Sequence, residues 1–117
     1  MSQHSGLSPE RWARFSREQH VLMIANEMNR ASKTLDSESS EIRLGCYERA
    51  LILTDLTVQV QHSSSLRREL LRWRDLLALL YISGQQPDLL AHFAVTRALL
   101  LLTAESARQI RFVCPPR

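Results

Sequence analysis

Residues 88–105 read DLLAHFAVTRALLLLTAE, and apolar residues occupy almost every side of the helix that this stretch predicts. A helix that is apolar all round is either buried all round or crosses a membrane. A membrane span needs about 20 largely uncharged residues, whereas this run is shorter between its flanking acids and contains His92 and Arg97. The stretch therefore predicts a buried helix of a globular protein, over about 87–108.

The apolar surface of this helix predicts self-association. A bundle of four helices shields only about half of each helix, and monomers seldom expose a continuous apolar patch larger than a few hundred Å². We therefore expect a homodimer formed across a twofold axis, or contact with an unidentified protein partner. The segment RFVCPPR at 111–117 is an alternative cover, through Phe112 and Val113. The residues expected at the interface are Leu90, Ala94, Val95, Leu99, Leu101 and Leu102.

Three other helical patterns precede this one, at about 9–35, 41–62 and 66–82. Ser8 and Pro9 form the expected start of the first helix, with Ser8 as the N-cap and proline at the first helical position. Gly84 is expected to end the third helix and Pro87 to open the fourth. The helices are separated by clusters of polar and cap-forming residues, which are DSESS at 36–40, HSSS at 62–65 and SGQQPD at 83–88.

These helices predict an all-α fold, an antiparallel up-down-up-down four-helix bundle, because short polar turns join neighbours of similar length. The clearest seam lies on 66–82, where apolar residues recur at alternating spacings of four and three: Leu66, Leu70, Trp73, Leu77 and Leu80. A helical-repeat solenoid is the structural alternative, but the hairpin at 41–82 has no second copy in the sequence. We expect one domain with an ordered core at 8–108 and tails at 1–7 and 109–117.

The composition fits one globular domain, since 44% of the 117 residues are hydrophobic, 23% are charged and only 3 are glycine. The N-terminus does not have the pattern of a secretion signal. Cys46 and Cys114 are too few for a disulfide framework. These observations predict a cytoplasmic protein with reduced thiols, no membrane attachment and no cofactor.

Basic residues predominate in the second half of the chain, although the net charge is only +3. Within LRRELLRWRD at 66–75, a possible contact for RNA or another anion consists of Arg67, Arg68, Arg72 and Arg74. Trp73 would complete a basic and aromatic surface of the kind that binds nucleic acid, but its place on the leucine seam predicts burial. The simplest interpretation of these arginines is a solvated or ion-paired helix face.

Arg14 and His20 have the spacing R-x5-H, which resembles that of the HEPN group of helical-bundle ribonucleases. The resemblance implies that the arginine and the histidine act together on RNA. On a regular helix six residues separate two side chains by about 240°, so this pair shares a face only if the helix is interrupted. The group also carries its motif in a later helix, and we do not assign the chain to it.

A polar cluster of Gln19, Asn26 and Arg49 falls on otherwise apolar stripes and is the candidate pocket for a small ligand. Polar residues in such seams more often fix the register of the helices. Two pairs, His20 with Glu27 and Asp88 with His92, could each offer two metal ligands, but a di-metal bundle needs a Glu-x-x-His pair on each of two helices. We expect no metal site.

No motif for nucleophilic catalysis or phosphate binding is present in the sequence. The sequence therefore favours a small non-catalytic bundle that acts through self-association and protein–protein interaction. The alternatives are an RNA-associated bundle, either a binder or a HEPN-like ribonuclease, and a sensor with a small-ligand pocket.

Overall fold

The computed structural model describes residues 7–35, 40–83 and 88–114, and helices are the regular elements within these ranges. The four long helices are α2 (Arg17–Ser32), α3 (Ser40–Val60), α4 (Ser64–Ser83) and α5 (Leu89–Leu100). The three short helices are α1 (Pro9–Trp12), α6 (Ala104–Ala107) and α7 (Ile110–Val113). The positions of Gly84 and Pro87, the predicted end of one helix and start of the next, lie outside the described residues.

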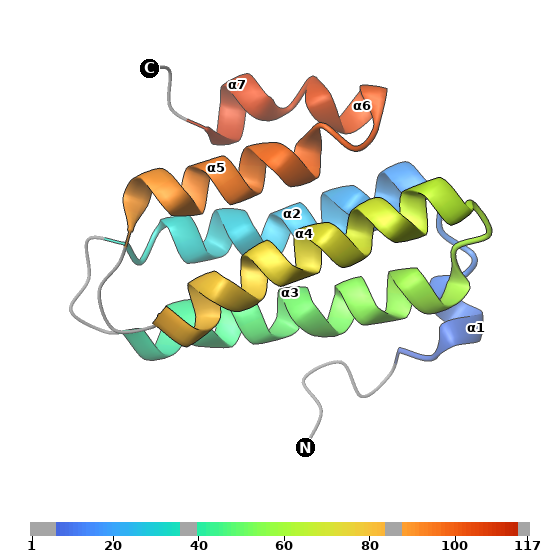
Figure 1. The fold of residues 1–117 in the computed structure, drawn as a ribbon, viewed down its shortest axis with the longest axis horizontal. Helices are drawn as coiled ribbons and strands as arrows, with labels where there is room; N and C mark the ends of the chain where they lie inside the picture. Colours follow the sequence, from blue (N-terminus) through green and yellow to red (C-terminus); the bar gives the residue numbers. More distant parts are fainter. Residues whose placement is uncertain (1–6, 36–39, 84–87, 115–117) are drawn as a thin grey trace.

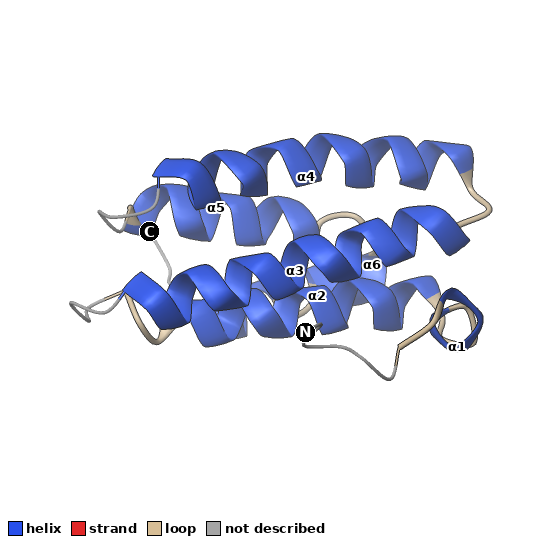
Figure 2. Cartoon of the chain, turned by 90° about the horizontal axis from the view of Figure 1, so that it is seen from below, coloured by secondary structure: helices blue, strands red, loops and turns tan. Residues whose placement is uncertain are grey.

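The long helices confirm the predicted antiparallel up-down-up-down bundle (Figure 1). Along the chain α2 packs on α3, α3 on α4 and α4 on α5, and the bundle closes where α5 packs on α2. Seen from below, α4 and α5 form one layer, and α2 and α3 form the other (Figure 2). Each layer therefore presents an outer surface made by two neighbouring helices.

The first predicted helix, 9–35, is wrong as a single element, because the chain turns between α1 and α2. Ser16 caps α2 through a capping box, in which its hydroxyl accepts from the Gln19 N–H and the Gln19 side chain accepts from the Ser16 N–H. Beyond the turn, Trp12 is fully buried, and its indole Nε1 donates to Thr57 Oγ1 of α3 at 2.9 Å. The turn exists because burying this indole against α3 requires α1 to leave the axis of α2.

The fourth predicted helix, 87–108, is likewise too long, since α5 ends at Leu100. Thr103 caps α6 by accepting from the Ser106 N–H, and the Ser106 hydroxyl donates to the Leu100 carbonyl at 2.7 Å. These bonds satisfy backbone groups at the break and turn the chain back. Of the expected tail at 109–117, the described residues 109–114 contain α7 and its C-cap, and Ile110 and Val113 pack against the core.

The core runs along the axis of the bundle and is filled by large side chains from every long helix. Small residues lie between them, so that helix backbones can approach one another. The large members with little or no exposure include Trp12, Ile24, Met28, Leu53, Trp73, Leu77, Leu99 and Leu100, and the small ones include Ala25, Ala31 and Ala50.

Candidate functional site

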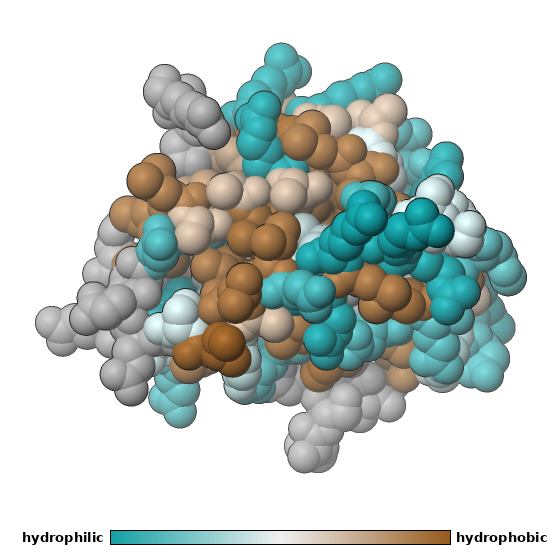
Figure 3. Space-filling view, viewed as in Figure 1, coloured by the Kyte–Doolittle hydropathy of each residue, from teal (hydrophilic) through white to brown (hydrophobic). Residues whose placement is uncertain are grey.

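The outer surface of the α4–α5 layer carries the largest gathering of exposed apolar side chains in the described part of the chain. In the space-filling view these side chains form a nearly continuous apolar area over the C-terminal half of α4 and along α5 (Figure 3). We name this surface the α4–α5 face. Its members are Leu76, Leu79 and Ile82 of α4, with Leu90 and Leu101 of α5 and its C-cap.

The predicted interface residues divide between this face and the core. Leu90 is 86% exposed and Leu101 is 57% exposed, and Ala94 lies between them on the same exposed side of α5. Val95 and Leu99, in contrast, are buried against the chain's own helices.

Leu102, the last residue predicted for the interface, is partly buried against the core. Leu90, Ala94 and Leu101 are therefore the predicted residues that remain available to a partner.

The individual α4 residues of this face were not named from the sequence. At 100° per residue, Leu79 and Ile82 lie on the side of α4 away from the buried stripe of Leu70 and Leu77. The periodicity of the sequence could have identified these residues, because it places apolar side chains on two opposite sides of α4.

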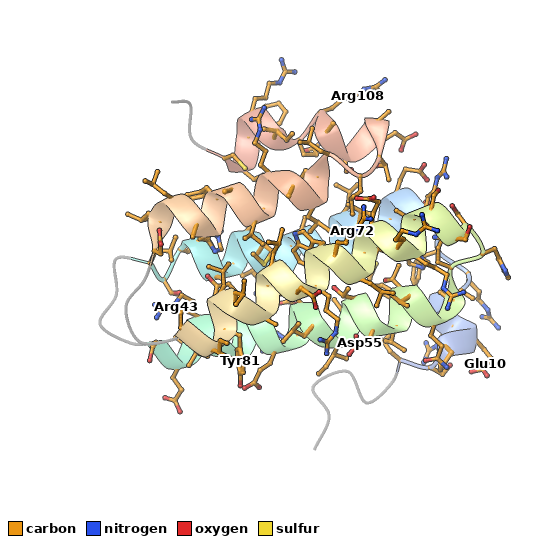
Figure 4. All side chains as sticks on the ribbon, viewed as in Figure 1. Glu10, Arg43, Asp55, Arg72, Tyr81 and Arg108 are labelled. Carbon is orange, nitrogen blue, oxygen red and sulfur yellow. The ribbon has the colours of Figure 1, made fainter. Side chains whose placement is uncertain are left out.

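Three polar contacts fix the orientation of α4, and so determine which side faces outward. The Trp73 indole donates to the Val95 carbonyl of α5 at 2.8 Å. On the other flank, the Tyr81 hydroxyl donates to Glu48 of α3 at 2.6 Å, and Arg74 forms a two-pronged ion pair with Asp55 at 2.6 and 3.3 Å. Figure 4 shows Tyr81 and Asp55 beside the line where α3 and α4 meet.

The C-terminal helices cover α5 only in part. In Figure 1, α6 and α7 lie along the edge of α5 that faces away from α4, and the Cys114 thiol lies 3.9 Å from the Phe93 carbonyl. Phe112, expected as a cover, is itself 68% exposed, with the Arg111 guanidinium 4.8 Å from its ring centroid. As far as Cys114, where the described residues end, the C-terminal segment therefore leaves the α4–α5 face open.

The four arginines of the predicted anion contact do not act as one unpaired array. Arg74 is bound to Asp55, whose hydrogen bond and charge raise the pKa of the arginine. Arg72 is paired with Glu69 at 3.0 Å. Arg67 and Arg68 are exposed near the start of α4. Half of the predicted positive surface is thus neutralised by acids of α3 and α4.

The predicted polar pocket is only partly assembled. A cavity of about 390 Å³ opens beside α2, and Asn26 lines it. Arg49 does not line the cavity itself, but its Nε donates to Glu27 of the cavity wall at 3.0 Å. Gln19 lies elsewhere, in the capping box at the start of α2. The sequence did not place Glu27 and Arg30, the charged residues of the cavity wall, in this pocket.

Tyr47 and His92 form a buried hydrogen bond between α3 and α5, with 2.7 Å from Oη to Nδ1. Burial raises the pKa of Tyr47 to about 12, and the nearby Arg43 charge opposes this change. Burial also lowers the pKa of His92 to about 4, although the backbone of Met28 opposes the shift. Both shifts disfavour proton exchange near neutral pH, and the hydrogen bond links α3 to α5.

Arg14 and His20 are not presented together to solvent. The helix is interrupted between residues 12 and 17, as a shared face would require. His20 nevertheless turns inward, stacks on Trp12 with 4.7 Å between ring centroids, and lies 2.6 Å from the Trp12 carbonyl. Arg14 is exposed. His20 therefore contributes to the packing of α1 on the bundle.

The candidate metal pairs have other partners. Glu27 is bound to Arg49, Asp88 caps α5 by accepting from the Ala91 N–H, and His92 is bound to Tyr47. Among residues 7–35, 40–83 and 88–114, no three histidine, cysteine or acidic side chains gather as a metal site would require. Within the same ranges, none of the helices combines the length and apolar character that crossing a membrane demands.

Comparisons of the chain with protein-family models, with curated proteins and with solved structures gave no match.

Proposed function

We propose that this protein is a non-catalytic interaction module that forms a homodimer through the α4–α5 face. The single observation that carries the proposal is the exposure of Leu79, Ile82 and Leu90, which are 60%, 75% and 86% accessible on adjacent helices. Isolated apolar residues are normal on protein surfaces, but a continuous group over two packed helices is typical of an interaction site.

A second copy of the chain is the partner that needs the fewest assumptions. Two copies related by a twofold axis bring the same surface together, so each apolar residue is covered by a surface of matching character. Two antiparallel helices form a broad, shallow surface, and two such layers can stack as helices do within a bundle. Burying the exposed remainder of one leucine or isoleucine contributes on the order of 1 kcal/mol.

The borders of the α4–α5 face suit an interface with a polar rim. Arg72 and Glu69 form an exposed ion pair on α4, and Asp75 and Arg97 are exposed on α4 and α5. Charges of both signs at the edge of an apolar surface limit nonspecific association and fix the relative orientation of two copies.

We also propose that the protein works in a reducing compartment, as in the cytoplasm. Cys46 and Cys114 are both free thiols, and both are buried. A chain of this size in an oxidising compartment commonly uses its cysteines as a disulfide framework.

Light scattering over a range of protein concentrations tests the dimer. The expected result is a mass that rises from one chain to two as concentration increases. An apolar interface also predicts nearly the same association at low and high salt, whereas phosphate contacts lose affinity steeply over that interval. A mass of one chain at every concentration would refute the proposal.

A further inference from the structure

The cavity beside α2 belongs to the other layer of the bundle and shares no residue with the α4–α5 face. Its apolar wall consists of Leu7, Met23 and Leu53. Its volume of about 390 Å³ is within the range of pockets that hold small molecules. Such pockets are mostly apolar, with a few polar groups that fix the orientation of the ligand.

The charged part of the wall contains an internal ion pair. The Glu27 side chain is only 9% exposed, and it accepts from Arg49 Nε at 3.0 Å. The Arg49 side chain is itself only 18% exposed. The hydrogen bond to Glu27 raises the pKa of Arg49, and burial opposes this effect. The negative charge of Glu27 is thus balanced from inside the protein.

A second positive charge remains at the cavity mouth. Arg30 lines the cavity, and its side chain is 62% exposed. Its contacts with the two Glu27 oxygens are long, at 3.4 Å each, so its guanidinium is only weakly held. Arg49 is not part of the cavity lining, but Glu27, Arg30 and Arg49 together carry a net charge of +1 at this wall. The side-chain amides of Asn26 and Asn29 supply further donors on the same wall.

We infer that this cavity binds a small monocarboxylate with an aliphatic chain. The carboxylate accepts from Arg30, with the geometry that arginine favours for bidentate contacts. The chain lies against Met23 and Leu53, from which it displaces water. A cationic ligand is excluded by the net positive charge, because it would compete with two arginines for the single carboxylate of Glu27.

The test uses octanoate as the probe and 1-octanol as its uncharged counterpart, with the full chain labelled with ¹⁵N. Octanoate should shift the side-chain amide signals of Asn26 and Asn29. Arg30 is 62% exposed, so its pair with the carboxylate contributes about 1 kcal/mol at most, which predicts up to roughly five-fold tighter binding of octanoate than of octanol. Arg30→Gln should remove most of this preference, whereas Arg30→Lys should retain part of it.

Arg17→Gln is the matched control, because Arg17 is also on α2, is 59% exposed and is paired with an acid of its own helix. This variant changes the net charge equally and should bind octanoate as the wild type does. The inference is refuted if Arg30→Gln binds octanoate unchanged, or if octanol binds as tightly. It is also refuted if the shifted signals map to the α4–α5 face. None of these results depends on whether the chain dimerises.

Discussion

The most decisive prediction concerns Leu90→Glu on α5. In a single chain this position is 86% exposed, so the substitution should change the free energy of unfolding by no more than about 0.5 kcal/mol. In the proposed dimer the side chain is buried, and a fully buried leucine contributes about 1.5–3 kcal/mol. A twofold axis places the substitution in both copies, so the loss is on the order of 3–6 kcal/mol. Dissociation constants change tenfold per 1.4 kcal/mol, so the constant should rise at least about 100-fold.

Sedimentation velocity over a concentration series measures the dissociation constant, and urea unfolding at low concentration measures the stability of the single chain. Ile42→Glu is the matched control, because Ile42 is 60% exposed but lies on α3, outside the α4–α5 face. It introduces the same charge and should leave association unchanged. Equal association of wild type and Leu90→Glu would refute the assignment of this face. An equal loss in both variants would show that added charge, rather than the face, controls association.

Three further measurements address the core and its polar contacts. Leu99→Ala empties a site with 0% exposure, so urea unfolding should give a loss of about 2–5 kcal/mol, and a loss below about 1 kcal/mol would contradict its place in the core. His92 has its pKa lowered from 6.5 to about 4, so the unfolded chain binds its proton first, and the free energy of unfolding should fall as pH drops from 6.5 towards 4. His92 contributes about 3 kcal/mol at most to this loss of stability. The variant His92→Gln should therefore show a weaker dependence of the free energy of unfolding on pH between 6.5 and 4. The same dependence in variant and wild type would argue against a neutral buried imidazole. For Arg74 and Asp55, whose side chains are 37% and 55% exposed, a double-mutant cycle with alanine should give about 1 kcal/mol or less; a coupling of several kcal/mol would mean that the pair is shielded from water.

Much of the fold could be predicted from the sequence, because the four long helices have strong apolar periods. The seam of Leu66, Leu70, Trp73 and Leu77 is buried as its spacing predicts. The local sequence also indicates the break before α2, because Ser16 and Gln19 have the spacing of a capping box. The apolar pattern continues across this break, and it therefore predicted a single helix over 9–35 in place of α1 and α2.

The candidate sites were harder to predict, because they depend on which side of each helix faces a neighbour. Helix α5 is apolar on all sides, so periodicity could not predict which of its leucines are buried. Leu99 is buried and Leu90 is exposed. Glu27 and Arg49 come from different helices, and only the packing of α2 on α3 brings them together as an ion pair beside the cavity.

The sequence by itself determined the all-helical class and the order of the long helices, because helix periodicity and capping are properties of neighbouring residues. Only the tertiary structure decided that Trp12 folds under α3, that α6 and α7 turn back along α5, and that the leucines of α4 and α5 form one outer face. These outcomes depend on the rotation of each helix about its axis, which contacts between residues distant in the chain determine.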